Sequence, residues 1–142
     1  MPDFVGTKIA LVCGDKLLMI LRDDTPGLRF AGMWDFPGGG REKGETPLQC
    51  VIREVEEELS IRLKPDSILL QKEVESMHDP NLRAYFFVAK VTQNEIDAIQ
   101  FGKEGQRWGL MSIDDFFGRS DVVPKLKDRF KDYFDSIKPQ PE

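Results

Sequence analysis

Hydrophobic positions in the first part of the chain group into short runs that are typical of β-strands. Residues 5–13 and 16–22 are rich in aliphatic side chains, and the Gly14-Asp15 pair between them is typical of a hairpin turn. Residues 23–33 carry a proline and two glycines, which favour a loop. The pattern therefore predicts that the chain opens with a β-hairpin, followed by a long loop.

After residue 46 the apolar positions recur at helical spacing instead. Thr46 is the expected N-cap, Pro47 occupies the first helical position, and Gln49 completes a capping box. An apolar stripe at this spacing is usually buried, so we expect the helix to pack on the strands. The stripe consists of Leu48, Val51, Ile52, Val55 and Leu59.

The second half of the chain continues to mix the two patterns. Residues 67–77 and 82–90 are expected strands, and a capping box at Thr92 opens a short helix. Residues 108–112 form a last short strand, and residues 123–137 carry the apolar face of a final helix. Strands and helices in this order predict an α/β or α+β domain, with a mixed sheet covered by helices.

Length and composition agree with one domain. The 142 residues suit a single unit that spans residues 1–137, and the Pro-rich residues 138–142 are expected to be a short flexible tail. No apolar run reaches the roughly 20 residues of a membrane span, and the start of the chain lacks the pattern of a secretory signal. We expect a cytoplasmic protein that has no membrane partner and carries Cys13 and Cys50 as free thiols.

The charge balance restricts the partners further. The chain has 20 basic and 25 acidic residues, so its formal net charge is −5. Binding to duplex nucleic acid relies on a cationic surface, which makes this chain a poor candidate for it. An anionic ligand would need a local cationic patch or a bridging metal ion.

Three carboxylates share one sector of the helix that begins at Pro47. Glu54, Glu57 and Glu58 are spaced i, i+3 and i+4, so they lie on neighbouring turns and repel one another. A solvated acidic face explains this spacing, and so does a site for Mg²⁺ or Mn²⁺, because both ions prefer oxygen ligands. The preceding Gly-rich turn at residues 37–40 favours the second interpretation, because it lets backbone groups approach a metal or a phosphate.

The segment around these carboxylates resembles the Nudix box, the pattern G-x5-E-x7-R-E-U-x-E-E-x-G-U, where U is aliphatic. The one departure is Ser60, where the box has glycine. Residues 34–38 and 102–106 also look like segments of the MutT-type members of the family. The matching box positions are Gly39, Glu45, Arg53, Glu54, Val55, Glu57, Glu58 and Ile61.

The resemblance implies an α/β/α sandwich around a mixed sheet, and it implies roles for single residues. In such proteins the box arginine, here Arg53, orients the glutamate that matches Glu54, and the residue that matches Glu45 supports it. Glu54 and Glu104 are both candidates for the general base, and Glu54 is preferred because Arg53 adjoins it. The implied catalytic residues are Arg53, Glu54, Glu57 and Glu104. The implied ligands of Mg²⁺, or of Mn²⁺ in its place, are Glu54, Glu57, Glu58, Glu104 and the carbonyl of Gly38.

Substrate contacts are expected from five positions, and most of them have an ordinary structural alternative. Arg22 lies where MutT-type members place a phosphate-binding arginine, although a surface arginine at the end of a strand explains it too. Gly39 belongs to the glycine turn, and Arg41 flanks that turn as a candidate for phosphate binding, although an ordinary solvent-facing charge explains it too. Asp121 is a candidate for a contact to the base, although a helix N-cap explains it too. Phe36 suits a base pocket, although core aromatics are common.

Ser60 falls where the family glycine ends the helix in the left-handed conformation. Serine there is expected to cost about 1 kcal/mol of stability and to leave the carboxylates intact.

The resemblance implies a Mg²⁺-dependent hydrolase that converts a nucleoside triphosphate to the monophosphate and pyrophosphate. Its substrate is a small nucleotide, and the protein is expected to be a monomer or a homodimer. A hydrolase of ADP-ribose, a nucleotide sugar or a related compound is the first alternative. A catalytically silent nucleotide-binding module is the second.

Overall fold

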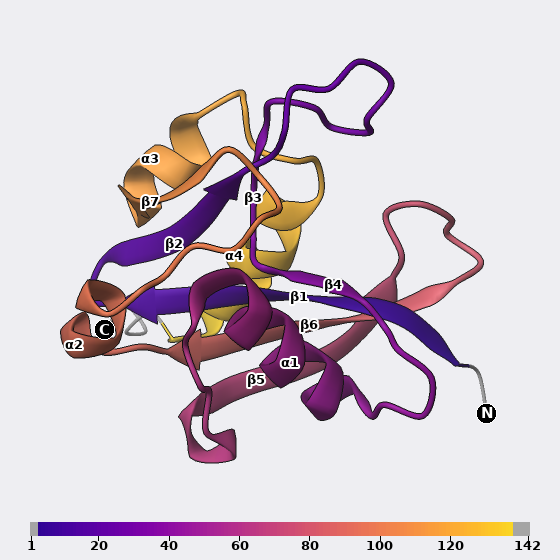
Figure 1. Ribbon diagram of the computed structural model, residues 1–142, viewed down its shortest axis with the longest axis horizontal. Helices are drawn as coiled ribbons and strands as arrows, with labels where there is room; N and C mark the ends of the chain where they lie inside the picture. Colours follow the sequence, from indigo (N-terminus) through magenta and orange to yellow (C-terminus); the bar gives the residue numbers. More distant parts are fainter. Residues whose placement is uncertain (1–2, 138–142) are drawn as a thin grey trace.

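The computed structural model describes residues 3–137, and they form one mixed β-sheet with helices on both faces (Figure 1). The expected tail at residues 138–142 lies outside the described residues. The strands are β1 (Phe4–Cys13), β2 (Lys16–Leu21), β3 (Trp34–Asp35), β4 (Gly38–Gly40), β5 (Ile68–Glu75), β6 (Arg83–Lys90) and β7 (Arg107–Ser112). The helices are α1 (Pro47–Leu59), the 3₁₀ turn η1 (Pro65–Ser67), α2 (Gln93–Asp97), α3 (Ile113–Gly118) and α4 (Leu126–Ile137).

The sheet is built around the first hairpin. β1 and β2 pair antiparallel, with Leu11 opposite Leu18, and β2 also pairs with β3 and β7. On its other edge β1 pairs in parallel with β6, which carries β5, so the order is β3-β2-β1-β6-β5. The parallel β1–β6 pair makes the sheet mixed, as the sequence predicted.

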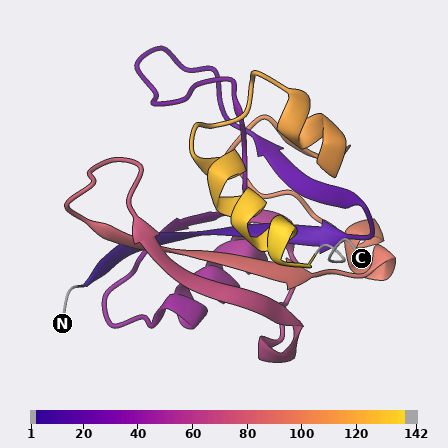
Figure 2. The same cartoon turned by 180° about the vertical axis from the view of Figure 1, so that it is seen from behind.

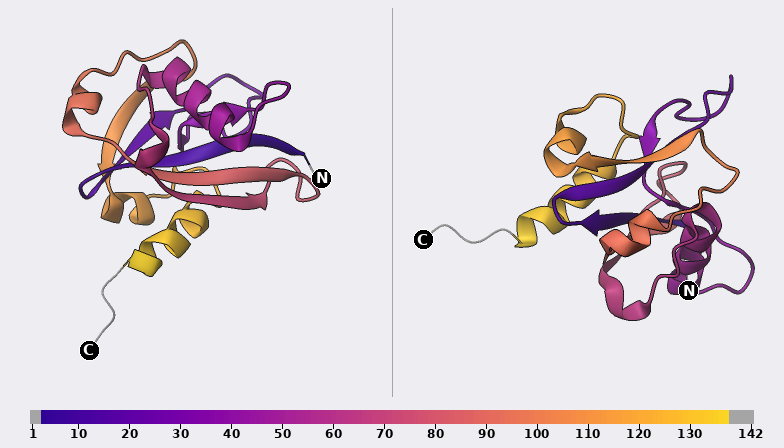
Figure 3. Two further views of the ribbon diagram at one scale, coloured as in Figure 1. Left: turned by 90° about the horizontal axis from the view of Figure 1, so that it is seen from below. Right: turned by 60° about the vertical axis from the view of Figure 1, so that its left-hand side comes forward.

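Apolar side chains alternate between the two faces of the sheet, so each face has its own core. Ile9 and Leu11 of β1 pack toward α1, whereas Ala10 packs toward α3 and α4. Figures 2 and 3 show α4 crossing the face opposite to α1. The predicted three-layer α/β/α sandwich is therefore confirmed.

Local signals in the sequence define the start and the end of α1. The Thr46 hydroxyl accepts from the Gln49 amide at 3.2 Å, and the Gln49 side chain accepts from the Thr46 amide at 2.9 Å. The predicted capping box is confirmed. The helix ends at Ser60, whose φ of 60° and ψ of 28° are left-handed.

Four short elements were missing from the sequence prediction: β3, β4, α3 and the 3₁₀ turn η1. The glycines at 38–40, expected as a turn, form strand β4 and pair with Gly6, Thr7 and Lys8 of β1. β3 has only two residues and α3 only six, so neither produces a readable period.

The last helix begins later than predicted. α4 starts at Leu126, five residues after Asp121, so the N-cap role considered for Asp121 is wrong. Asp121 instead pairs with Arg119 at 2.8 Å, and its carbonyl accepts from the Trp34 amide. Pairing of residue 122 with Trp34 keeps this segment extended until the helix begins.

Two further observations concern cysteines and membranes. Cys13 and Cys50 are free thiols, as expected. Within residues 3–137, no helix has the length and apolar character needed to cross a membrane.

Candidate active site

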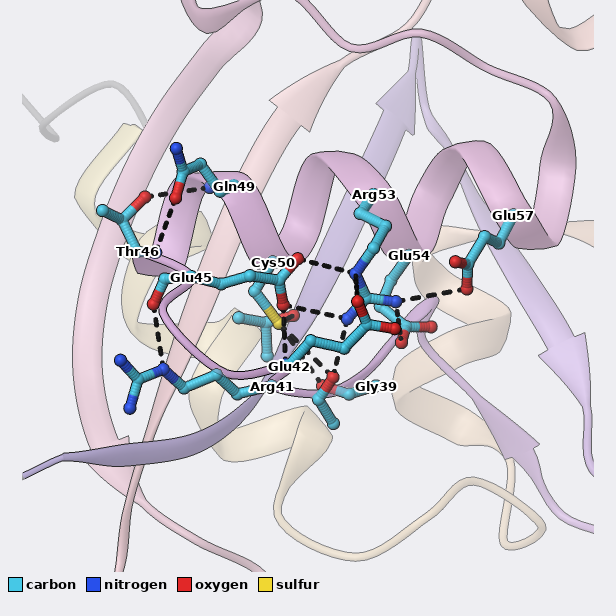
Figure 4. Close-up of polar contacts among 12 residues, drawn as sticks. Gly39, Arg41, Glu42, Glu45, Thr46, Gln49, Cys50, Arg53, Glu54 and Glu57 are labelled. Atoms are coloured by element: carbon cyan, nitrogen blue, oxygen red, sulfur yellow. Dashed lines mark hydrogen bonds and ion pairs between the residues drawn. The ribbon is translucent and has the colours of Figure 1, made fainter.

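Arg53 is the centre of the polar network on the acidic side of α1 (Figure 4). Its guanidinium donates to both Glu45 oxygens, at 2.6 and 3.0 Å, and to the carbonyl of Gly40 at 2.9 Å. It also donates to Glu54 at 2.9 Å and to Glu57 at 3.2 Å. Arg53 therefore joins the loop before α1, the glycine strand β4 and two box carboxylates in one unit.

The same network changes the ionisation of its members. The hydrogen bonds from Arg53 lower the pKa of Glu45 to about 2, and those bonds in turn raise the pKa of Arg53. Glu45 therefore stays negative and Arg53 positive at neutral pH. This pairing supports the expected role of Arg53 in orienting Glu54.

Glu54 lies against the glycine strand. A Cβ at Gly39 would lie 2.6 Å from the Glu54 carboxylate, so a larger residue at this position would displace the carboxylate. Partial burial raises the pKa of Glu54, and the charges of Glu57 and Glu104 raise it further. Two negative side chains are thus close enough to Glu54 to affect its proton.

Glu58 points toward Gly38, the first residue of strand β4. The Gly38 amide donates to Glu58 Oε1 at 2.8 Å, and burial raises the pKa of this carboxyl to about 8. Gly38 has a φ of 133°, and a Cβ there would lie 2.2 Å from the carbonyl oxygen of Thr7. Glycine is therefore required at 38 both for its backbone conformation and for its approach to β1.

Glu104 reaches the site from the loop before β7. The Gly102 amide donates to the carbonyl of Glu58 at 2.8 Å, which ties the start of the loop to α1. At its other end Gln106 donates to the carbonyls of Leu21 and Arg22, each at 2.8 Å. These contacts place the 102–106 loop across the end of β2, where Glu104 borders the same cavity as Glu58.

That cavity has a volume of about 240 Å³ and lies between the glycine strand, β2 and the 102–106 loop. Its polar wall includes an ion cluster that the sequence analysis missed. Asp35 Oδ2 accepts from Lys8 Nζ at 2.8 Å and from Arg22 at 3.1 Å. A lysine within the apolar run of β1 was the available signal for this cluster. The cavity is lined by Lys8, Ile20, Arg22, Asp23, Leu28, Asp35, Phe36, Gly38, Glu58, Glu104 and Gly105.

The carboxylates suit a hard divalent cation, but their side chains do not form a complete set of metal ligands in this structure. Among residues 3–137, no three acidic, histidine or cysteine side chains stand ready to hold a metal ion. Glu57 accepts a hydrogen bond from Arg53, whereas Glu58 accepts one from the Gly38 amide. The carboxylates are nevertheless hard oxygen donors, and a cation would offset the burial that raises the pKa of Glu58. The chemistry of these residues therefore fits a Mg²⁺ or Mn²⁺ ion.

The expected substrate residues lie in different surroundings. Arg22 borders the cavity, and Gly39 lies beside Glu54. Arg41 pairs with Asp3 and lies 4.6 Å from the ring of Phe4, and Asp121 is paired with Arg119. These last two are not brought to the cavity wall.

Phe36 borders the cavity, but most of its side chain belongs to the core. It is 1% exposed, and its ring stacks on that of Phe116 at 5.3 Å between centroids. Core packing is thus the role that the structure shows for this ring.

Comparison with known proteins agrees with this geometry. The NUDIX domain family matches residues 5–134 of the chain. The 8-oxo-dGTP diphosphatase of Escherichia coli strain K12 is 36% identical over 103 residues, which cover 68% of this chain and 76% of that protein. The ADP-ribose pyrophosphatase of Methanocaldococcus jannaschii is 32% identical over 103 residues, which cover 70% of this chain and 57% of that protein.

A solved structure extends the similarity in the fold to almost the whole chain. The MutT protein from Methanosarcina mazei Go1 superposes with a TM-score of 0.75 over 97% of each chain, at 20% sequence identity. The family match covers the sheet, the Arg53 network and the 102–106 loop together. The chain therefore belongs to the NUDIX domain family and is a MutT-like Nudix hydrolase.

Proposed function

We propose that this protein is a Mg²⁺-dependent pyrophosphohydrolase that cleaves a nucleoside triphosphate to the monophosphate and pyrophosphate. Nudix hydrolases act on nucleotide pyrophosphate bonds and generally use divalent metals. The observation that carries the finer proposal is the cavity that Glu58 and Glu104 line together with Lys8 and Arg22. Carboxylates for cations and basic groups for phosphate thus line one cavity.

The metal would be held by Glu54, Glu57, Glu58, Glu104 and the carbonyl of Gly38. When bound, it supplies charge neutralisation at the phosphate oxygens and a lowered pKa for the attacking water. Arg53 keeps the Glu54 carboxylate in place, and Arg22 binds a phosphate oxygen. Glu54, whose partial burial already favours the protonated form, accepts the proton of the attacking water.

The substrate is a free nucleotide. The E. coli relative, an 8-oxo-dGTP diphosphatase, favours a nucleoside triphosphate, which would give this protein a role in removing oxidised nucleotides from the nucleotide pool. A hydrolase of ADP-ribose or of a nucleotide sugar is the second candidate, which the archaeal relative favours. The two candidates differ in product, because a triphosphate yields pyrophosphate and ADP-ribose yields two monophosphates. A silent binding module is the third candidate, and the retention of Glu54, Glu57 and Glu58 counts against it.

One experiment separates these candidates. Purified protein is incubated with Mg²⁺ or Mn²⁺ and a panel of canonical and oxidised nucleoside triphosphates, ADP-ribose and nucleotide sugars, and the products are identified. We expect pyrophosphate from one group of triphosphates. Monophosphates from ADP-ribose alone would move the assignment to the second candidate, and no turnover of any compound would favour the silent module.

Variants of the box carboxylates complete that experiment. The Glu57→Gln/Glu58→Gln double variant is expected to lose both Mn²⁺ binding and hydrolysis, since it removes two of the proposed ligands. Glu54→Gln is expected to lower kcat by about a hundredfold or more, the usual range for a general base. Undiminished hydrolysis by the double variant would contradict the proposal, and a small effect of Glu54→Gln would make Glu104 the base.

The proposal includes a cytoplasmic location, because both cysteines are free thiols, as is usual in a reducing compartment. It also includes a monomer or a homodimer, which sedimentation equilibrium would distinguish.

A further inference from the structure

Asp35 is a buried carboxylate with an incomplete set of partners. It is 3% exposed, and its Oδ2 accepts from Lys8 and Arg22. Its second oxygen, Oδ1, is buried and has no hydrogen-bond partner among the described residues. A buried oxygen without a partner costs free energy, so packing and stability alone do not explain an aspartate at this position.

The two cations that Asp35 holds are placed at the junction of two hollows. Lys8 and Arg22 line the cavity described above, and both also line a neighbouring groove that runs along the glycine strand to Ser76, Met77 and His78. Gly38 and Glu104 are shared by the two hollows as well. A ligand that extends from one hollow into the other would therefore pass Lys8 and Arg22.

Lys8 is held at this junction by its strand. Its Cα is paired with that of Gly38, the residue whose amide binds Glu58. Its Nζ donates to Asp35 and to the carbonyl of Phe36, at 2.8 and 3.4 Å, and its side chain keeps 19% of its surface exposed. The ammonium group is thus held by two acceptors, and the Lys8 side chain still borders the cavity.

The charges explain why the site needs two cations. Among the described residues that line the first cavity, only Lys8 and Arg22 are positive, whereas Asp23, Asp35, Glu58 and Glu104 are acidic. The whole chain is also acidic, with a formal charge of −5. A polyphosphate entering this wall meets repulsion everywhere except at the Lys8–Arg22 pair and at bound metal.

We propose that Lys8 is a second phosphate-binding residue of the active site and that Asp35 is the positioning residue that holds it beside Arg22. The inference rests on the proposed function, because it assumes a polyphosphate substrate. Asp35 bridges the two cations and reduces their mutual repulsion, so their free N–H groups are directed at one phosphate chain. The sequence resemblance assigned no role to either residue.

The test compares Lys8→Met with Lys16→Met. Lys16 is at the start of β2, is half exposed, and is 4.0 Å from Asp15, so the control loses the same charge away from the cavity. Four quantities are measured on the 142-residue protein: KM and kcat for the best nucleotide of the panel, the Kd of inorganic tripolyphosphate, and the Kd of Mn²⁺ alone. Thermal unfolding is recorded for each variant to show that it is folded.

We expect Lys8→Met to raise KM and the Kd of tripolyphosphate by about tenfold, as for the loss of one charge-assisted hydrogen bond. We expect kcat and the Kd of Mn²⁺ to stay within about threefold of wild type. Lys8→Arg should restore most of the affinity, because it keeps a cation at the same place. Asp35→Asn should raise KM in the same direction with little change in kcat.

Several outcomes would overturn the inference. An unchanged Kd of tripolyphosphate in Lys8→Met would overturn it. An increase in the Kd of Mn²⁺ as large as the increase in the Kd of tripolyphosphate would also overturn it, because Lys8 would then act through Glu58. Failure of the wild-type protein to bind tripolyphosphate would also do so. If wild-type protein binds tripolyphosphate through Lys8 but hydrolyses no nucleotide, the proposed function fails and the assignment of Lys8 stands.

Discussion

The backbone at Gly39 runs so close to the Glu54 carboxylate that a methyl group there would lie 2.6 Å from it. Arg53 holds the same carboxylate from the other side, at 2.9 Å. At the scale of single residues the site therefore depends on one contact between groups 15 positions apart, Gly39 and Glu54, and on one between the neighbours Arg53 and Glu54. The box pattern names these residues, and the contacts show how the Arg53 and Glu54 side chains and the Gly39 backbone hold one another in place.

Glu45 gives a pH-dependent prediction at this scale. Its pKa in the folded protein is about 2, below the ordinary value of 4.5, because Arg53 donates two hydrogen bonds to it. Its contribution to stability is therefore fully present above pH 4.5 and is lost as the pH falls from 4.5 toward 2. We expect Glu45→Gln to lower the free energy of unfolding at pH 7 by about 1–3 kcal/mol, and this difference to shrink toward zero over that range.

Urea unfolding at pH 7, 4.5 and 3 measures this difference. Glu42→Gln is the matched control, because Glu42 is exposed and lies 3.6 Å from Arg53, so its contribution is small. A wild-type advantage over Glu45→Gln that is the same at pH 3 as at pH 7 would contradict the assignment.

At the scale of elements, α1 presents its apolar stripe to the sheet and its carboxylates to the cavity side. The spacing of the residues sets which of them share a face, because each residue turns the helix by about 100°. The capping box at Thr46 fixes where the helix begins. The end of the helix is less well adapted, because Ser60 adopts a left-handed conformation that favours glycine.

Ser60→Gly is therefore expected to stabilise the protein by about 1 kcal/mol. Part of this gain is offset, because the Ser60 hydroxyl donates to the carbonyl of Gln100 at 3.3 Å. Ser60→Ala is the control, since it loses the hydroxyl and keeps the strained backbone, and it should not stabilise. Chemical denaturation measures both variants, and a glycine variant less stable than wild type would show that the hydroxyl contact outweighs the strain.

At the scale of the whole molecule, one sheet separates the α1 core from a second core that is rich in aromatic rings. Phe36 belongs to the second core, together with Phe86, Phe116 and Phe130. α3 and α4 close the domain on the face opposite to α1 (Figure 2). Phe36 lies in this second core and also borders the cavity, so a substitution there can separate a role in packing from a role in substrate binding.

Phe36→Leu tests this separation. If the ring serves the core, the variant should lose on the order of 1–2 kcal/mol of stability and keep its KM for nucleotide within about threefold. Phe130→Leu, which lies in the same core, should behave alike. Steady-state kinetics measure KM, and urea unfolding measures stability. A large rise in KM for Phe36→Leu but not for Phe130→Leu would show that the Phe36 ring contributes to the base pocket.

Much of the fold was predictable because long elements carry strong periodic signals. The hairpin of β1 and β2, the capping box of α1 and the strands β5 and β6 were all predicted near their observed bounds. The strand at Gly38–Gly40 was not, because its pairing with β1 leaves no pattern in three glycines. The start of α4 was placed too early, because pairing of residue 122 with Trp34 overrides the local helical pattern.

The sequence by itself determined the acidic face of α1, the glycines beside it and the family to which the chain belongs. These features depend on spacing along one element, which a fixed helical repeat converts into geometry. Only the tertiary structure decided that Lys8, Arg22 and Asp35 share a cluster and that Glu104 borders the cavity of Glu58. These residues come from separate strands and loops, and strand pairing and loop docking bring them together without any local signal in the chain.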